Sequence, residues 1–360
     1  RKMKRGTYGN VRPSFVYGGC SMATKVTLKE IAQEVGLSPS AVSLVLNDRP
    51  CRISDENRRR IKEVAARKRY VPNQIARSLV MQQSRTLGLI VPNIMSRFFS
   101  SFARNLEVRC RERGYALFIM NSDGKTENDA DLVRLLINRG ADGIFLVAAE
   151  EVSPDPLLTE QLEAGIVPVV MVDRSIENAP GDKVRFDSEL GGYLATKHLL
   201  DEGHRRIACV VNTASHTGRD RLAGCRRAFA EAGAPFGEDL VFESDYYIAD
   251  GCRAAERIVA SDATAIFASS DNIALGVLKC LHAHGKRVPR DYSLVSYDNS
   301  AADALFEPAL TAIEQDVEEL ADHALELLLA RVEAKDGTPG PFEERVLPPR
   351  LVHNASVSRP

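Results

Sequence analysis

Residues 26–47 read VTLKEIAQEVGLSPSAVSLVLN, and this stretch decides the fold of the first part of the chain. Thr27 and Glu30 have the spacing of a capping box, which opens a helix over residues 28–34 whose apolar positions recur at helical spacing. Gly36 follows at the point where the chain needs a sharp turn. The pattern therefore predicts a short helix that ends in a tight turn.

A second short helix follows this turn. Ser38 is a suitable N-cap, Pro39 stands at the first helical position, where its missing N–H costs nothing, and Asn47 ends the helix. Two such helices form a helix-turn-helix unit, whose second helix presents its N-terminal residues to the major groove of DNA. The residues of this unit that we expect to contact double-stranded DNA are Thr27, Ser38, Pro39, Ser40, Ala41, Ser43, Leu44 and Asn47.

A third helix is predicted from Ser54 to about Arg69, and it completes an all-α domain over residues 24–71. Residues 1–83 carry 17 Lys and Arg against 6 Asp and Glu, whereas the rest of the chain carries 30 against 43. Many of these basic residues lie in the third predicted helix, where a basic run is usually only a solvated face. Beside a helix-turn-helix unit, contact with DNA phosphates becomes the better interpretation.

The sequence texture changes near residue 85. Apolar runs of four to six residues alternate with amphipathic stretches, a pattern typical of parallel sheets covered by helices on both faces. The span 85–352 exceeds one ordinary domain, so we expect an α/β core of two doubly wound lobes. Lobe 1 is expected at about 85–186 and 314–336, and lobe 2 at about 187–313 and 337–352.

Polar residues follow several of the predicted strands. Ligands of doubly wound sheets bind beyond the carboxyl ends of the strands, so these residues are candidates for a binding site. Carboxylates accept hydrogen bonds from sugar hydroxyls, arginine offers a fork of donors, and aromatic rings stack on the apolar face of a sugar or on a base. The residues in these positions are Phe98, Phe99, Asp173, Arg221, Tyr246, Asp271 and Asp298.

Three blocks of sequence closely resemble the lac repressor/galactose repressor family. They are the stretch 26–47, RYVPNQIARSL at 69–79 and SRTLGLIVPNI at 84–94, and the resemblance extends over residues 24 to about 352. It implies a periplasmic-binding-protein-like core and a bacterial transcription regulator, expected to be a repressor. Such a regulator grips a palindromic operator as a homodimer and binds a small effector between the two lobes.

The resemblance also implies a hinge helix within the linker 72–84, which folds only on the operator. Its implied DNA contacts are Asn73, Arg77 and Leu79, with the leucine wedged into the minor groove. The residues agree with this role, because Pro72 and Asn73 suit a helix start and the stretch is too short to be helical alone. A plain packing role for Leu79 stays open.

The family's effector contacts match the candidate positions one by one and add Thr217. Each aspartate is equally explained as a helix N-cap, and Asp271 and Asp298 are the most open to that alternative. In the purine-responsive branch an arginine occupies the position of Ser215, so we expect a sugar or sugar derivative and keep a purine or nucleoside as the alternative. Leu44 also departs from the family, where this base-reading position often holds a polar residue.

Other classes of protein fit the sequence less well. A sugar-binding module of a transport system would share the core but not the helix-turn-helix domain. The sequence lacks the common phosphate-loop, dinucleotide, metalloprotease and hydrolase motifs, so we expect no enzyme and no cofactor. The seven cysteines are odd in number and none has C-x-x-C spacing, which argues against a disulfide framework and against a zinc site. We therefore expect a reducing, cytoplasmic location and no metal.

The two ends of the chain carry weaker signals. Residues 1–23 are basic, contain Gly, Pro and Tyr, and lack the apolar core of a secretory signal, so we expect a disordered extension with Met22 as the true start. No apolar stretch is long enough for a membrane span. The tail 353–360 has no leucine heptads, so we expect a dimer rather than a tetramer held by a coiled coil.

Overall fold

The computed structural model describes residues 26–71, 83–149, 154–300, 307–334 and 340–360. The chain divides into two compact units, residues 1–77 and 78–360. The expected N-terminal extension and the expected hinge contacts Asn73, Arg77 and Leu79 lie outside the described residues. Among the helices that are described, none combines the length and apolar character needed to cross a membrane.

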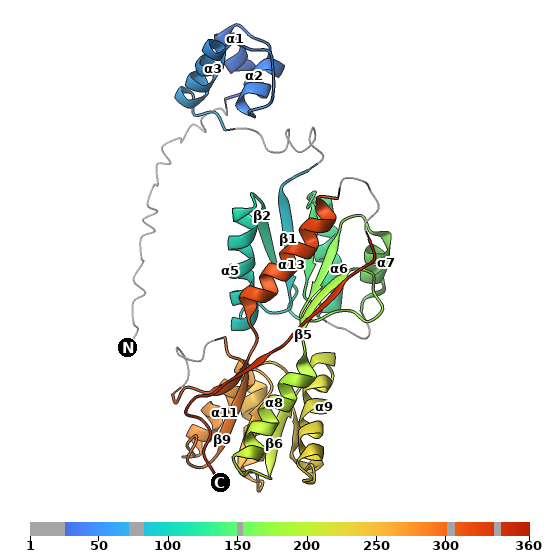
Figure 1. Ribbon diagram of the computed structural model, residues 1–360, viewed down its shortest axis with the longest axis vertical. Helices are drawn as coiled ribbons and strands as arrows, with labels where there is room; N and C mark the ends of the chain where they lie inside the picture. The colour runs from blue at the N-terminus through green and yellow to red at the C-terminus, as the bar shows by residue number, and fades with distance from the viewer. Residues whose placement is uncertain (1–25, 72–82, 150–153, 301–306, 335–339) are drawn as a thin grey trace, which may run out of the picture. The chain divides into compact units, whose positions relative to one another are not determined.

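The first unit contains three helices, as predicted (Figure 1). They are α1 (Leu28–Val35), α2 (Pro39–Leu46) and α3 (Asp55–Arg67). The hydroxyls of Thr27, Ser38 and Ser54 accept hydrogen bonds from backbone N–H groups in the first turn of each helix, so each helix begins at its predicted cap. Gly36 has a φ of +70°, the left-handed conformation that the turn after α1 requires.

The core of this first unit is small. It consists of eight buried residues contributed by all three helices: Ile31, Ala32, Val35, Val42, Val45, Ile61, Val64 and Ala65. The side chain of Arg58 ties the loop before α3 to the helix, since it donates to the carbonyls of Cys51 (2.9 Å) and Ile53 (3.3 Å). Arg58 therefore has a structural task within the basic face of α3.

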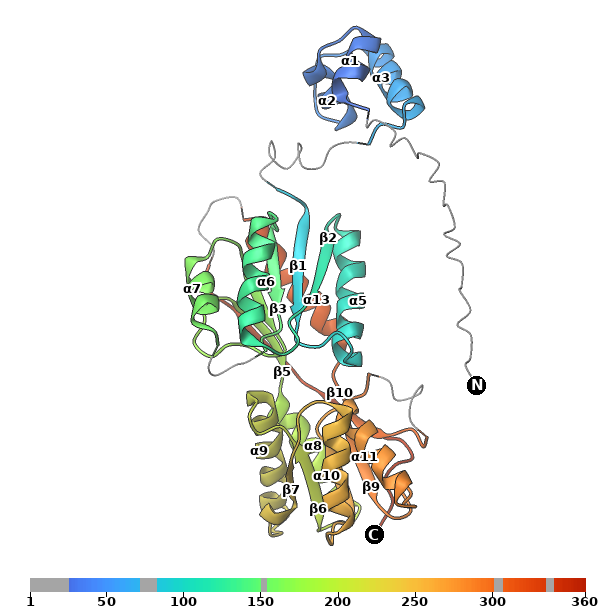
Figure 2. The same ribbon diagram turned by 180° about the vertical axis from the view of Figure 1, so that it is seen from behind.

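Lobe 1 is a six-stranded parallel sheet of order β11-β5-β4-β3-β1-β2. Helices α5 and α13 cover one face of this sheet, and α6 and α7 cover the other (Figures 1 and 2). The bounds of its elements are β1 (Thr86–Val91), α5 (Arg97–Glu112), β2 (Ala116–Asn121), α6 (Thr126–Asn138), β3 (Gly143–Leu146), α7 (Pro156–Ala164), β4 (Val169–Val172), β5 (Asp182–Phe186), α13 (Val317–Val332) and β11 (Glu344–Leu347).

Lobe 2 repeats this plan with the strand order β12-β10-β9-β8-β6-β7, in which only β12 is antiparallel to its neighbour among the described strands. Helices α8 and α9 cover one face and α10 and α11 the other (Figure 2). Its elements are α8 (Ser188–Asp201), β6 (Ile207–Val211), α9 (His216–Glu231), η1 (Glu238–Leu240), β7 (Val241–Glu243), α10 (Ile248–Val259), β8 (Ala265–Ala268), α11 (Asp271–Ala283), β9 (Ser293–Asp298), β10 (Thr311–Glu314) and β12 (Arg350–Val352).

The structure corrects one expected boundary. Residues 337–352 were expected in lobe 2, but Glu344–Leu347 forms β11, which pairs in parallel with β5 of lobe 1. Only the following strand, Arg350–Val352, belongs to lobe 2. Residues 344–347 alternate weakly in polarity and lie at a sheet edge, half exposed, so the apolar pattern that reveals a buried strand is missing here.

Candidate functional site

The predicted DNA-reading residues gather at the start of α2. Ser40 is exposed, Ala41, Ser43 and Leu44 are half-buried, and Leu44 is absent from the apolar side chains that pack against the core of this unit. These four positions of α2 lie outside the apolar core of the unit. They present a short hydroxyl and an apolar side chain, the two chemistries expected to meet base edges and thymine methyl groups.

Three other predicted contacts already have intramolecular partners. Thr27 Oγ1 accepts from the Glu30 backbone N–H and donates to the Glu30 carboxylate. The side-chain amide of Asn47 donates to the carbonyl of Ser43 at 2.7 Å. Ser38 Oγ accepts from the Ala41 N–H at 3.2 Å, which leaves its own hydrogen available to a phosphate. The hydrogen bonds of these three side chains therefore stabilise the ends of α1 and α2.

The second unit contains a cavity of about 260 Å³ between its two lobes. It lies beyond the carboxyl ends of the strands of both sheets, where doubly wound sheets bind ligands. The structure brings together all the predicted effector residues, since the residues that line the cavity include Phe98, Phe99, Asp173, Thr217, Arg221, Tyr246, Asp271 and Asp298.

Arg221 is the most deeply buried charged group of this cavity, with 4% of its surface exposed. Its guanidinium donates to the carbonyl of Ser269 at 2.6 Å and lies 3.7 Å from the centre of the Tyr297 ring. Behind it, Gly192 lets α8 touch α9, because a Cβ atom on Gly192 would lie 1.9 Å from the Arg221 carbonyl oxygen. This contact fixes the backbone from which the guanidinium projects.

Two carboxylates at the ends of neighbouring strands face the same space. Asp298 accepts from the amide of Gln315 at 2.9 Å, and Asp271 accepts from the hydroxyls of Ser296 (2.6 Å) and Ser300 (2.8 Å). Burial, followed by the charge of Asp271, raises the pKa of Asp298 to about 7. Burial also raises the pKa of Asp271. The N-cap of α11 is Ser270, so Asp271 does not perform the capping role that was its alternative explanation. Asp298 keeps part of that role, because its carboxylate accepts from the Asp271 backbone N–H at 3.4 Å, the first N–H of α11.

Asp173 faces the cavity from lobe 1. It follows β4 directly and has a φ of +62°, a conformation that turns the chain sharply at the sheet edge. Burial raises the pKa of its carboxyl group. A buried carboxylate at the end of one sheet and a buried arginine at the end of the other give a ligand polar anchors from both lobes.

A hydroxyl cluster and two aromatic rings complete the walls. Ser215 Oγ lies 2.9 Å from the Tyr246 hydroxyl, and Thr217 Oγ1 lies 3.4 Å from it. Phe98 and Phe99, both buried in the first turn of α5, form an edge-to-face pair with centroids 5.3 Å apart. The cavity therefore combines hydroxyls, carboxylates, a guanidinium and apolar ring faces.

Sequence reasoning missed several lining residues, of which Arg174 is the most informative. Its guanidinium lies 4.9 Å from the centre of the Tyr246 ring and 5.7 Å from that of Phe99. Arg174 comes directly after Asp173, so its position at a strand end was a usable signal. Gln315 was missed because β10 precedes it with only four residues.

The chain matches known proteins along most of its length. Residues 27–73 match the bacterial regulatory proteins of the lacI family, and residues 196–357 match the periplasmic binding protein-like domain. The HTH-type transcriptional repressor PurR of Aliivibrio fischeri is 33% identical over 337 residues, which cover 92% of this chain and 98% of the relative. PurR of Vibrio parahaemolyticus is 33% identical over 341 residues, with 92% and 99% covered.

Solved structures of transcriptional regulators also resemble this chain. A LacI family transcriptional regulator from Enterococcus faecium with bound ribose is 30% identical, with a TM-score of 0.68 over 76% of this chain and 99% of that one. The complex of the regulator CelR with cellobiose is 28% identical, with a TM-score of 0.67 over 92% and 100%. The operator-bound lac repressor dimer, 24% identical, shares the fold with a TM-score of 0.81 over 93% and 99%.

The three-helix unit, the two-lobed core and these relatives agree with the resemblance found in the sequence. The family consists of transcriptional regulators that bind operator DNA, dimerise and respond to small effectors. The chain therefore belongs to the lacI family of bacterial regulatory proteins and is a DNA-binding transcriptional repressor of that family.

Proposed function

We propose that the effector of this repressor is a sugar or sugar derivative, anchored between the lobes by Asp173, Arg221 and Asp298. One observation carries the proposal: these charged groups, from both lobes, converge on one cavity at the strand ends. Sugar hydroxyls donate and accept hydrogen bonds at once, so they match carboxylates and a guanidinium placed side by side. The relatives solved with ribose and with cellobiose support this class of ligand.

A purine or nucleoside is the second candidate, because the rings of Phe99 and Tyr246 offer faces for a planar base. Two features weigh against it. Ser215 holds a hydroxyl where a purine-binding relative is expected to place an arginine, and the guanidinium of Arg174 lies against both rings. A base would have to displace this guanidinium before it could stack.

Calorimetry on the full-length protein separates the two candidates. The protein is titrated with a panel of mono- and disaccharides, sugar phosphates, nucleobases and nucleosides. We expect heat from at least one sugar and none from the bases. If a nucleobase binds and no sugar does, the sugar proposal is wrong and the second candidate replaces it.

For the DNA-binding mechanism, we infer that effector binding changes the angle between the lobes and thereby the spacing of the two hinge segments in the dimer. Coupling of this kind requires a difference in affinity between two states, typically about 1–3 kcal/mol. Operator affinity is measured by fluorescence anisotropy at fixed salt, on a near-palindrome with a central CG step from the upstream DNA. We expect Leu79→Ala to weaken operator binding. An unchanged affinity would contradict the insertion of Leu79 into the minor groove.

We also infer that the protein acts in the cytoplasm and catalyses no reaction. The family it belongs to is one of transcriptional regulators, whose ligands act by binding. A turnover assay on the sugar that gives heat, with products separated by chromatography, tests the second statement. Conversion of that sugar at a rate proportional to protein concentration contradicts it.

A further inference from the structure

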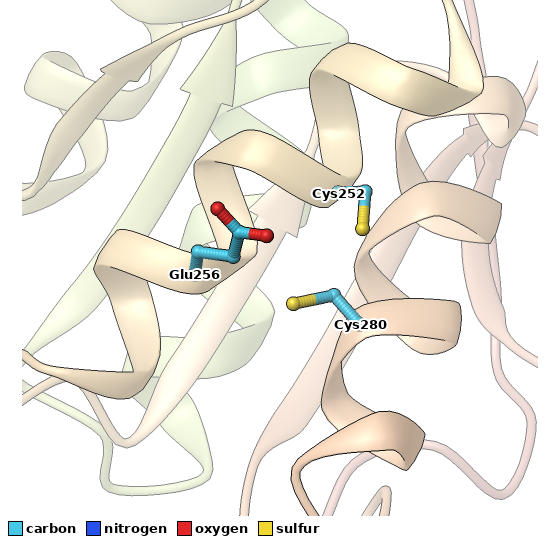
Figure 3. A group of neighbouring side chains, drawn as sticks. All are labelled: Cys252, Glu256 and Cys280. Atoms are coloured by element: carbon cyan, nitrogen blue, oxygen red, sulfur yellow. The ribbon is translucent and has the colours of Figure 1, made fainter.

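A cluster of side chains that ligate metals lies in lobe 2, outside the residues that line the effector cavity (Figure 3). Cys252 and Glu256 belong to α10, and Cys280 belongs to α11. Their two sulfur atoms and one carboxylate oxygen lie within 4.8 Å of one another. Figure 3 shows the three side chains converging on the space between the two helices.

The fold brings the two helices unusually close at this point. A Cβ atom on Gly276 would lie 2.1 Å from the carbonyl oxygen of Ile248 and 2.8 Å from the backbone nitrogen of Cys252. Helix backbones are therefore in direct contact one turn before Cys280. Because the two backbones are fixed against each other, side chains from the next turns meet without a mobile loop between them.

The cluster has a regular arrangement along both helices. Cys252 and Glu256 are four residues apart on α10, so they share a face, and Cys280 and His284 are four apart at the end of α11. The Nδ1 atom of His284 lies 3.6 Å from the Cys280 sulfur. The same Nδ1 atom lies 2.9 Å from the Cys280 carbonyl oxygen, so the converging ligand atoms are those of Cys252, Glu256 and Cys280, with His284 beside them.

The distances suit a tetrahedral ion after a small adjustment. Zinc bonds of about 2.3 Å to sulfur and about 2.1 Å to oxygen or nitrogen place ligand atoms roughly 3.5–3.8 Å apart. The three atoms, at most 4.8 Å apart, therefore have to close by roughly 1 Å. Rotation of the exposed Glu256 side chain moves its carboxylate toward the two sulfur atoms, and its exposure provides an entry path from solvent.

The local charge favours a cation over a redox-active thiol pair. Glu256 makes no ion pair or hydrogen bond within the part of the chain that the structure describes. A carboxylate oxygen of Glu256 lies within 4.8 Å of both thiols. Reactive thiols need electropositive surroundings, which stabilise the thiolate, and these surroundings are the opposite. A bound cation would neutralise the same negative charge.

We propose that lobe 2 binds a thiophilic divalent cation, represented by Zn²⁺, through Cys252, Cys280 and Glu256, with His284 as the fourth ligand once its ring leaves the Cys280 carbonyl. Binding replaces the two S–H bonds by two sulfur–metal bonds and releases two protons to solvent. Helix α10 begins directly after Tyr247 and α11 begins at Asp271, both of which line the effector cavity. The ion would therefore hold together two helices that carry effector residues at their N-terminal ends.

The test uses full-length protein that has been treated with a chelator and reduced with a phosphine. Titration with Co²⁺ alone is expected to give a thiolate-to-cobalt absorption band that saturates at one equivalent and disappears on addition of Zn²⁺. Cys252→Ala and Cys280→Ala should each abolish the band and weaken Zn²⁺ binding by roughly 100-fold or more, since even residues behind metal ligands are worth 10–100-fold. Glu256→Gln, a change at an exposed position, should weaken it by roughly tenfold.

Cys225→Ala is the matched control. Cys209 and Cys225 form a second pair of neighbouring thiols in the same lobe, both fully buried. This variant should keep the cobalt band, and thermal unfolding verifies that each variant is folded. The proposal is overturned if the folded parent shows no band, or if the band survives in Cys252→Ala and Cys280→Ala. A Cys252–Cys280 disulfide found by mass spectrometry in unreduced, metal-free protein would instead establish a redox pair.

Discussion

The DNA-reading helix and the effector cavity recognise their ligands with side chains in opposite surroundings. In the first unit, Ser40 is exposed and Leu44 is half-buried, outside the small apolar core. In the second unit, Arg221 is 4% exposed and hydrogen-bonded, and Asp298 is accessible from the cavity although it lies deep in the protein. One site presents its recognition groups and the other encloses them.

This difference has an energetic consequence. An exposed side chain can be exchanged with little effect on folding, whereas a buried charge is costly unless its partners remain. Operator preference can therefore change through single substitutions in α2 without loss of the fold. A change of effector in the cavity has to conserve the balance between the arginines and the carboxylates that line it, among them Arg174, Arg221, Asp173, Asp271 and Asp298.

The largest effect is expected for Arg221→Ala. Removal of the guanidinium leaves Asp298 without its compensating charge and Asp173 with Arg174 alone, so we expect the free energy of unfolding to fall by about 3–5 kcal/mol. Effector affinity should fall by at least roughly 100-fold, because charge-assisted hydrogen bonds are lost. Urea unfolding and calorimetry measure the two effects.

Arg227→Ala provides the matched control for this prediction. Arg227 lies on the same helix but is exposed, where it pairs with Glu189 on the surface. Its removal should change the unfolding free energy by less than about 1 kcal/mol and leave effector affinity unaltered. Equal effects of the two substitutions would contradict the distinction between enclosed and presented groups.

The next largest effect is expected for Leu44→Ala, which tests the DNA-reading helix α2. Loss of an apolar contact in the major groove should weaken operator binding by roughly tenfold, while the melting temperature stays unchanged. Its neighbour Val45 is fully buried, so Val45→Ala should lower the stability of the first unit by about 1–3 kcal/mol. Anisotropy and thermal unfolding distinguish the pair. A loss of stability in Leu44→Ala would show that this residue packs rather than reads.

The fold was predictable where local signals are strong. The caps at Thr27, Ser38 and Ser54 and the apolar runs of the central strands all correspond to observed elements. The strands β5, β7, β10, β11 and β12 were missed, because each contains a charged residue and none has an apolar run of four residues. Their position depends on tertiary pairing, which the apolar pattern of the sequence does not encode.

The candidate effector site was predictable in its composition rather than in its contacts. Placing polar residues at the ends of apolar runs found Asp173, Asp271 and Asp298, because parallel strands bring their carboxyl ends to one edge. Side-chain packing across the cavity determines the contacts. It places two serines on Asp271 and brings Arg174 against the Tyr246 ring of the other lobe. Cys252 and Cys280 likewise lie together because two helices are in close contact, and the sequence has no C-x-x-C spacing that would predict this.

A smaller effect should link effector binding to protons. Because the pKa of Asp298 is raised to about 7, part of the population is protonated at neutral pH. Hydroxyls that donate to the carboxylate favour its charged form, so binding should lower this pKa and release protons. A fall of one unit would make affinity rise by roughly fivefold between pH 6 and pH 8. Calorimetry in buffers of different ionisation enthalpy measures the release.

Asp298→Asn controls for this linkage, since the amide does not titrate. The raised pKa also favours the folded state at low pH. This contribution is complete below the ordinary aspartate pKa of 3.8 and is lost as the pH rises through about 7. The variant should therefore show a flatter dependence of stability on pH in this window. Proton uptake on binding, or a linkage that persists in Asp298→Asn, would assign the titration to another group.

The smallest effect is expected at Arg174, which is half-buried and thus intermediate between the presented and the enclosed groups. Its guanidinium lies over the Tyr246 ring of the other lobe, a contact worth about 0.5–1 kcal/mol. If this contact helps to hold the lobes around the effector, Arg174→Ala should weaken effector binding by roughly two- to fivefold. Tyr246→Phe keeps the ring but removes the hydroxyl that contacts Ser215, so it separates the two roles of the tyrosine.

A double-mutant cycle with Arg174→Ala and Tyr246→Leu decides whether this contact acts in binding. The two losses should be non-additive by about 0.5–1 kcal/mol. The losses from Arg174→Ala and Tyr246→Phe should instead add, because phenylalanine keeps the ring that the guanidinium contacts. Strict additivity would mean that the guanidinium binds without the ring, as a presented group does. Arg174 would then belong with Ser40 and Leu44 in its energetics, although it lines the cavity that encloses Arg221.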